Sequence, residues 1–338
     1  MNHIKPLTLT AFIAAAIILL ALNNFNLRQK LQAYQNPNGI SRHGQLKVDN
    51  GKLIDQNGDP AQLRGISSHG IQWYPQYGNH RSILTLRDAG ANLFRIAMYT
   101  TENGYDKDPE KSKTTLRMAL ENSLGADMYT IVDWHVLKDE SLTTYLDESL
   151  EFFDEISSLY ADEPGVIYEI CNEPNGDTTW DDIKAYAEQV IPVIRKNSPA
   201  AVIIVGTPNF STSIDEAAAD PLGFENIMYA FHFYADYSQG GYEWHFENAR
   251  EQNIGIFVSE WGIGSEYDED LYSELITKCG AFIDYLDSNG ISWASWALSN
   301  KDEGHSILKP DTKSWSKWDQ NELTDYGKFV FNRLGESS

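Results

Sequence analysis

Short apolar segments alternate with amphipathic segments throughout residues 43–338, and this alternation limits the fold more than any other feature of the chain. Several of the short segments are apolar at consecutive positions, as strands buried on both faces must be. The predicted strands are Gln62–Ser67, Asn92–Met98, Met128–Asp133, Val166–Cys171, Ala201–Val205, Ile227–Phe233, Gly255–Ser259 and Ile291–Trp296.

The segments between these strands have the spacing of amphipathic helices. The predicted helices are His80–Ala89, Thr114–Gly125, Thr144–Tyr160, Trp180–Lys196, Tyr242–Gln252, Glu269–Ser288 and Glu322–Leu334, with a shorter one around Ile214–Ala219. Eight strand-then-helix units in roughly 290 residues match the size and order of a (β/α)₈ TIM barrel. A doubly wound open sheet has the same alternation, but no phosphate-binding glycine loop follows the first strand. We therefore predict an α/β TIM barrel as a single domain.

The amino-terminal residues have the pattern of an export signal. Leu7–Leu22 is almost continuously apolar, with Lys5 before it and Arg28 after it. A short apolar stretch behind a positive amino terminus is typical of secretory signals. We predict a signal peptide or membrane anchor at residues 1–22 and a linker or stalk at 23–42. The protein is then exported, and is secreted, periplasmic or tethered to the membrane at the cell surface.

Composition limits the partners of the folded domain. The formal net charge is -23 with a pI near 4.6, and such a charge repels nucleic acids and anionic lipid surfaces. A neutral substrate suits it better, and nine Trp and eighteen Tyr offer flat faces on which sugar rings stack. Neither Cys171 nor Cys279 has a second Cys or a His at metal-ligand spacing. An exported protein could pair them, but we predict two buried free thiols and no essential disulfide. We expect a monomer.

Polar side chains gather near the carboxyl ends of six predicted strands. In a barrel these ends meet on one face and form the active site. Buried groups of this kind are unfavourable unless they form a network. The residues, in strand order, are Arg95, Asp133, His135, Asn172, Glu173, His232, Tyr234, Glu260 and Trp296.

Two carboxylates on different strands, Glu173 and Glu260, indicate glycoside hydrolysis. In that reaction one carboxyl carries a proton for the leaving oxygen while the other stays ionised to attack the sugar carbon. Arg95 and Tyr234 are expected beside Glu260, because a cation and a hydrogen-bond donor favour its charged form. Asn172 is expected to hold the sugar 2-hydroxyl.

The segments VIYEICNEPNG, MYAFHFY, IFVSEWG, IVDWH and SWALSNKDE resemble those of glycoside hydrolase family five in clan A, within its bacterial endo-β-1,4-glucanase (cellulase) branch. The resemblance extends from about Gly44 to the carboxyl terminus. It implies that Glu173 is the acid/base, that Glu260 is the nucleophile, and that configuration is retained, with carboxyl groups about 5–5.5 Å apart. The supporting residues that it implies are Arg95, His135, Asn172, His232, Tyr234 and Trp296.

The resemblance also implies sugar-binding residues and no cofactor. On the glycone side these are His69, Trp73, Tyr99, Lys301 and Glu303, with Trp296 under the sugar that is attacked. On the aglycone side, Phe210 stands where relatives usually have Trp.

Other functions fit part of this pattern. An endo-β-mannanase, a mixed-linkage glucanase or a xyloglucanase would have a cleft of the same geometry. A metal-dependent hydrolase could use Asp133 and His135 as ligands, but no other strand end supplies the further ligands that such a site needs. A carbohydrate-binding barrel without catalysis usually lacks one glutamate, and both are present. We therefore expect no metal and a β-glucan polysaccharide or oligosaccharide as substrate.

Overall fold

The computed structural model describes residues 39–138, 141–238, 240–264 and 269–336. The predicted signal or anchor at 1–22 and most of the predicted linker at 23–42 lie outside these residues. The last residues of that linker begin helix α2, Ile40–His43, whose first residue packs against the barrel. Within the described part of the chain, no helix combines the length and the apolar character needed to cross a bilayer.

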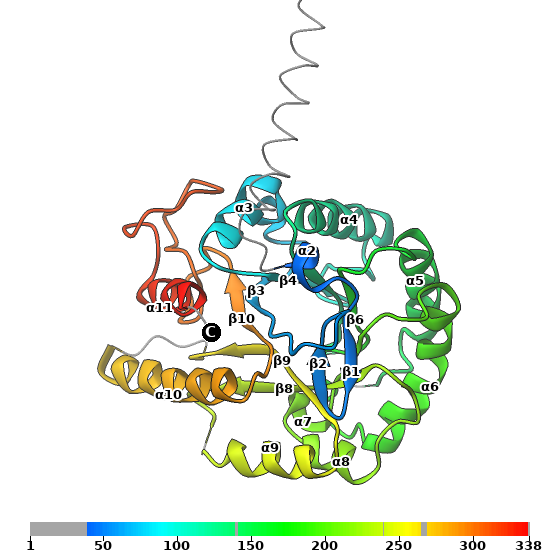
Figure 1. Cartoon of the computed structure of the whole chain (residues 1–338). Helices are drawn as coiled ribbons and strands as arrows, with labels where there is room; N and C mark the ends of the chain where they lie inside the picture. Colours follow the sequence, from blue (N-terminus) through cyan, green and yellow to red (C-terminus); the bar gives the residue numbers. More distant parts are fainter. Residues whose placement is uncertain (1–38, 139–140, 239, 265–268, 337–338) are drawn as a thin grey trace, which may run out of the picture.

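Eight parallel strands close into a barrel, which confirms the predicted fold (Figure 1). Each strand pairs with its neighbours in sequence, and the last strand pairs with the first. The strands are β3 Arg64–Ser68, β4 Leu93–Tyr99, β5 Tyr129–His135, β6 Val166–Glu169, β7 Ile203–Val205, β8 Ile227–Tyr234, β9 Gly255–Gly262 and β10 Trp293–Leu298.

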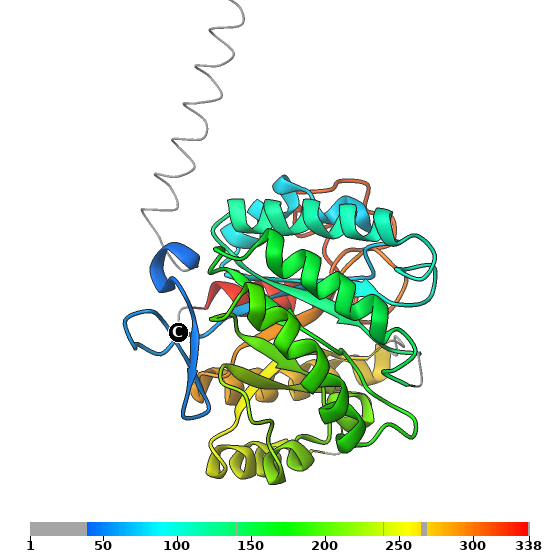
Figure 2. The same cartoon turned by 90° about the vertical axis from the view of Figure 1, so that its right-hand side faces the viewer.

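Helices surround the barrel on its outside, as Figures 1 and 2 show from two directions. They are η1 Pro75–Gly78, α3 His80–Asp88, α4 Pro109–Gly125, α5 Leu146–Leu159, α6 Trp180–Asn197, α7 Pro208–Ser211, α8 Ile214–Ala219, α9 Tyr242–Glu251, α10 Glu269–Ser288 and α11 Asp325–Gly335. Helix α4 begins five residues before its predicted start, because Asp108 caps it and Pro109 occupies its first position.

A hairpin that the sequence analysis did not predict covers the amino-terminal end of the barrel. Its strands, β1 Lys47–Asp49 and β2 Lys52–Ile54, pair antiparallel around Asn50 and Gly51. Both turn residues have positive φ, which is the geometry of an Asn-Gly hairpin turn. Leu53 of β2 then packs into the same buried cluster as the apolar side chains inside the barrel.

Apolar and polar residues occupy different levels inside the barrel. The side chains near the amino ends of the strands form an apolar cluster, and polar side chains follow at alternate positions along the same strands. The apolar set includes Leu93, Ile131, Ile167, Ala230 and Phe257, and the polar set that follows it is Arg95, Asp133, Glu169, His232 and Ser259. The site therefore lies at the carboxyl-terminal end of the barrel.

Some of the predicted site residues lie within strands rather than just past them. Arg95 is the third residue of β4, which continues because it pairs with β5 as far as Tyr99 and His135. Glu260 and Trp296 also lie inside β9 and β10. Glu260 and Trp296 belong to the carboxyl-terminal halves of their strands, and the long side chain of Arg95 reaches Glu260 from lower in the barrel.

Candidate active site

Arg95 is the centre of the buried polar network. Its Nε donates to Glu169 Oε2 at 2.7 Å, and one terminal nitrogen donates to Glu260 Oε2 at 2.9 Å. The other terminal nitrogen donates to Asn172 Oδ1 at 2.6 Å and lies 3.0 Å from Asp133 Oδ2. A planar guanidinium can satisfy several acceptors in this way, whereas an ammonium group cannot. Arg95 therefore fixes side chains from four strands or strand ends relative to one another.

Glu260 is held as a carboxylate by two donors. In addition to Arg95, the Tyr234 hydroxyl donates to its Oε1 at 2.7 Å. Burial raises the pKa of Glu260, but the positive charges of His232 and Arg95 and the Tyr234 hydrogen bond outweigh burial and hold that pKa below its ordinary value. Glu260 is thus kept ionised.

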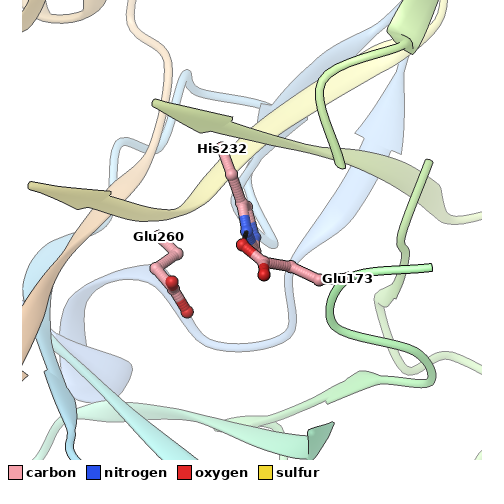
Figure 3. Close-up of side chains that lie close together, drawn as sticks. All are labelled: Glu173, His232 and Glu260. Carbon is pink, nitrogen blue, oxygen red and sulfur yellow. Dashed lines mark hydrogen bonds and ion pairs between the residues drawn. The ribbon is translucent and has the colours of Figure 1, made fainter. Parts of the chain in front are cut away.

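Glu173 lies in the opposite kind of environment. Burial and the negative charge of Glu260 raise the pKa of Glu173, although the nearby His232 cation opposes that rise. Its Oε1 lies 2.8 Å from His232 Nδ1, and Figure 3 shows its carboxyl group against the imidazole ring, with Glu260 to one side. Glu173 is therefore the carboxyl group of the pair that retains a proton more readily.

His232 joins Glu173 to a deeper carboxylate. Its Nε2 lies 3.0 Å from Ser259 Oγ, which donates to Glu169 Oε1 at 2.7 Å. Burial lowers the pKa of His232, but the partners Glu169 and Glu173 and the charge of Glu260 raise it to about 9. The imidazole is therefore a cation near neutral pH, and both ring nitrogens donate.

Two acidic residues that support this network were not predicted as such. Glu169, inside β6, had not been considered, and it pairs with Arg95. Asp133 was expected among the polar side chains at the strand ends, with a specific role only as a possible metal ligand, and its Oδ2 accepts from His135 Nδ1 at 2.6 Å. Glu169 lies at an inward position of the short strand β6, whose other residues are Val166, Ile167 and Tyr168, and the period-two pattern of that strand indicates it.

The turn after β6 brings Asn172 and Glu173 to the mouth of the barrel. A Cβ atom at Gly206 would lie 2.0 Å from the Cys171 carbonyl oxygen, so only glycine lets the chain after β7 pass this turn so closely. The Ser211 hydroxyl donates to the Asn172 carbonyl oxygen at 2.6 Å. Cys171 is buried at this contact and has a free thiol, as does Cys279.

Aromatic rings line the site beside this network. The His69 ring lies 5.6 Å from Trp73 and 5.1 Å from Trp296 between ring centroids, and Trp73 lies 5.0 Å from Tyr99. His135 stacks on Trp296 at 5.3 Å. Trp73 is 41% exposed, so part of its ring is open to a ligand.

Glu303 lies at the edge of this ring cluster. Its carboxylate is 2.5 Å from Lys301 Nζ and 3.4 Å from His69 Nε2. It is also 3.2 Å from the Nε2 of His305, a buried residue that the sequence analysis did not identify. Burial raises the pKa of Glu303, but its bonds to His305, His69 and Lys301 outweigh burial and lower that pKa strongly.

Phe210 lies in another part of the site. Its side chain is 47% exposed and lines a cavity of about 910 Å³ that also reaches Glu173 and His232. Its amide donates to the Pro174 carbonyl oxygen at 3.0 Å, which fixes this segment beside the turn that carries Glu173.

Glu173, His232 and Glu260 could in principle hold a metal, since one ligand atom of each lies within 4.8 Å of the others. Zinc accepts such a donor set. Here, both nitrogens of His232 and both oxygens of Glu260 already have protein partners. Arg95 also supplies positive charge at Glu260. The donor set thus fits proton transfer between protein groups better than metal binding.

A known protein family matches most of the chain, including the residues of the network around Arg95. Residues 54–302 match the model of the family described as cellulase (glycosyl hydrolase family 5). The chain belongs to this family. The match covers all eight barrel strands, β3 to β10, and includes Arg95, Glu173, His232, Glu260 and Lys301.

Two curated relatives of family 5 show the extent of the similarity. The chain is 41% identical over 297 residues to an endoglucanase of Clostridium saccharobutylicum, which covers 87% of this chain and 66% of that protein. It is 44% identical over 284 residues to endoglucanase A of Evansella cellulosilytica, with 83% and 58% covered. The chain therefore spans less than two thirds of the length of these relatives.

A solved family 5 structure extends the similarity to the fold. The catalytic domain of Thermobifida fusca endoglucanase Cel5A, determined in complex with cellotetraose, superimposes with a TM-score of 0.82 at 34% identity. The match covers 88% of this chain and 99% of that domain.

Proposed function

We propose that this protein is an endo-1,4-β-D-glucanase that hydrolyses internal β-1,4 bonds of cellulose or related β-glucans with retention of configuration. One observation carries the proposal: an oxygen of Glu173 and an oxygen of Glu260 lie within 4.8 Å of each other, and the environments of the two carboxyl groups shift their pKa values in opposite directions. Such proximity fits the roughly 5–5.5 Å between the carboxyl groups of retaining glycosidases rather than the roughly 6.5–9.5 Å of inverting ones.

In the first step, Glu260 attacks the anomeric carbon while Glu173 donates its proton to the leaving oxygen. A bond forms between Glu260 Oε and the sugar carbon, and the glycosidic bond breaks. Arg95 and Tyr234 hold the Glu260 carboxylate in place for this attack. Asn172, fixed by Arg95, is next to Glu173 in the sequence and binds the sugar 2-hydroxyl.

In the second step, the released chain leaves the site and a water molecule takes its place. Glu173, now ionised and paired with His232, removes a proton from that water as it attacks the glycosyl–Glu260 ester. The ester bond breaks and Glu260 returns as a carboxylate. Two inversions at the same carbon give net retention.

We place the glycone sugars against His69, Trp73, Tyr99 and Trp296, with Lys301 and Glu303 binding their hydroxyls. Flat aromatic faces with charged groups beside them are the usual means of orienting a polar ligand. The aglycone lies beside Phe210. The similarity to proteins named endoglucanases and the cellotetraose bound to the Thermobifida domain support glucan as the substrate.

A panel of soluble polysaccharides tests this substrate. We expect carboxymethylcellulose to lose viscosity early relative to the release of reducing ends, as internal cleavage requires. Mixed-linkage β-glucan and xyloglucan test whether the same cleft accepts related glucans. β-Mannan, whose sugar is an epimer of glucose, tests the mannanase alternative. Faster turnover of mannan than of every glucan would overturn the proposed substrate, and oligosaccharide binding without new reducing ends would overturn the proposed activity.

Replacement of Tyr234 by Phe tests how Glu260 is kept ionised. The variant loses the hydrogen bond to Glu260 Oε1, so the pKa of Glu260 rises and the acid limb of the kcat/KM profile moves to higher pH. We expect kcat/KM at the optimum to fall about tenfold. Tyr229→Phe is the matched control, because that hydroxyl accepts from the Leu222 amide away from the site. An acid limb that stays in place in Tyr234→Phe would contradict the role of Tyr234.

We further propose that the protein is exported and acts as a monomer. The uncharged, apolar Leu7–Leu22 supports export, followed either by secretion or by retention through a membrane tether. Cell fractionation with an antibody to the folded domain distinguishes secreted, periplasmic and membrane-bound protein. Light scattering at several protein concentrations measures the oligomeric state.

A further inference from the structure

The cavity beside Glu173 extends well beyond the catalytic pair. Its volume of about 910 Å³ is at the upper end of the range for ligand sites, more than a single sugar ring requires. None of the glycone-side residues His69, Trp73 and Tyr99 is among its described lining residues. It is therefore a separate part of the cleft, and helices α8 and α9 form its outer wall.

A hydrogen-bonded pair of polar residues, Asp215 and His245, lies at this outer wall. Asp215, the second residue of α8, binds the Nδ1 of His245 in α9, and Asn248 Nδ2 donates to Asp215 Oδ1 at 2.7 Å. The His245 ring lies between Phe231, at 6.3 Å, and Trp244, at 5.1 Å. The orientation of the imidazole is therefore fixed before any ligand arrives.

The remaining hydrogen-bonding capacity of the pair is available to a ligand. The bond to Asp215 uses Nδ1 of His245, so Nε2, which has no hydrogen-bond partner among the described residues, can bond a ligand hydroxyl. The Asp215 carboxylate has lone pairs beyond those used by His245 and Asn248. The exposed Phe210 ring lines the same cavity as this pair and Glu173.

We propose that Asp215 and His245 form an outer aglycone subsite that binds the hydroxyls of the second sugar after the scissile bond. Phe210 supports the first sugar, and the pair then selects chains with at least two sugar units on the leaving side. This inference rests on the proposed function, because the leaving side is defined by Glu173 as the acid.

The simplest competing explanation is that the pair only ties α8 to α9. A comparable hydrogen bond joins two other helices: Asp154 of α5 accepts from Asn197 Nδ2 of α6 at 2.9 Å. Asp154 does not line the cavity. Asp154→Asn is thus a control for the structural effect of Asp215→Asn.

The test compares two substrates in the full-length protein. Cellohexaose can fill the outer aglycone subsite, whereas 4-nitrophenyl β-cellobioside carries only an aryl group on that side. The variants are Asp215→Asn and His245→Phe, of which the second keeps an aromatic ring next to Phe231 and Trp244. For both, we expect the kcat/KM for cellohexaose, divided by that for the aryl cellobioside, to fall about five- to tenfold. The ratio for Asp154→Asn should stay within about twofold of wild type.

Equal losses on both substrates, or an unchanged ratio, would overturn the proposed subsite. A wild-type protein that hydrolyses neither substrate would instead contradict the proposed function. In that case, the affinity for cellohexaose decides the subsite without turnover: we expect His245→Phe to weaken it about five- to tenfold, and an unchanged affinity would overturn the inference.

Discussion

Replacing Glu260 by Ala is expected to reduce the turnover of cello-oligosaccharides by a factor on the order of 10³ or more. The variant lacks the carboxylate that both Arg95 and Tyr234 hold ionised next to Glu173. Without it no glycosyl ester forms, so the loss applies to natural and activated substrates alike. Steady-state kinetics with cellohexaose and 4-nitrophenyl β-cellobioside measures both.

Glu173→Gln is the matched comparison for this prediction, because it removes the proton donor and keeps the nucleophile. We expect kcat/KM to fall about 10²- to 10⁴-fold with cellohexaose, and much less with an aryl cellobioside, whose leaving group needs no proton. The kcat should fall on both substrates, because Glu173 is also the base of the second step. Unfolding temperatures of both variants near that of the wild type show that the fold is intact. Near wild-type turnover of cellohexaose by either variant would contradict the role assigned to it.

Replacing Arg95 by Lys is expected to destabilise the fold by about 3–5 kcal/mol, because breaking a buried ion pair leaves its partners uncompensated. The fully buried guanidinium contacts Asp133, Glu169 and Glu260, and a single ammonium group cannot reach all three acceptors. Urea denaturation measures the loss in the free energy of unfolding. Turnover should fall with it, since Glu260 and Asn172 lose their common donor.

Arg333→Lys is the control for the Arg95 prediction. Arg333 also bonds two carboxylates, Asp284 at 2.7 Å and Glu336 at 3.0 Å, but both partners are well exposed. Exposed pairs contribute about 0–1 kcal/mol, so this variant should unfold close to wild type. If Arg95→Lys were no less stable than Arg333→Lys, the network around Arg95 would not be a main support of the fold.

Much of the fold could be predicted because parallel barrel strands are buried on both faces and leave a strong apolar pattern. The bounds of the strands differ from the predicted ones by at most three residues at either end, and α8 spans the predicted Ile214–Ala219. The hairpin was missed because β1 and β2 are three residues each, too short for a periodic signal. Its Asn50-Gly51 turn was the available indication.

The site residues could be anticipated where a polar side chain interrupts a buried strand. Arg95, His232 and Glu260 are of this kind, and the structure brings all three together with Glu173. Glu169 also interrupts a buried strand, but it lies before the predicted strand end at Cys171, where site residues were not expected. His305 and His245 could not be found this way, because they lie in a loop and on a helix, and tertiary packing alone decides where their side chains point.

The central claim, that Glu260 forms the bond to the sugar carbon, is tested most directly by adding azide to Glu260→Ala. Azide should enter the space left by the carboxylate and attack an aryl β-cellobioside once. We predict restored release of the aryl alcohol and an α-cellobiosyl azide, identified by nuclear magnetic resonance. A β-azide, or α-azide formed by Glu173→Ala instead of Glu260→Ala, would contradict the account.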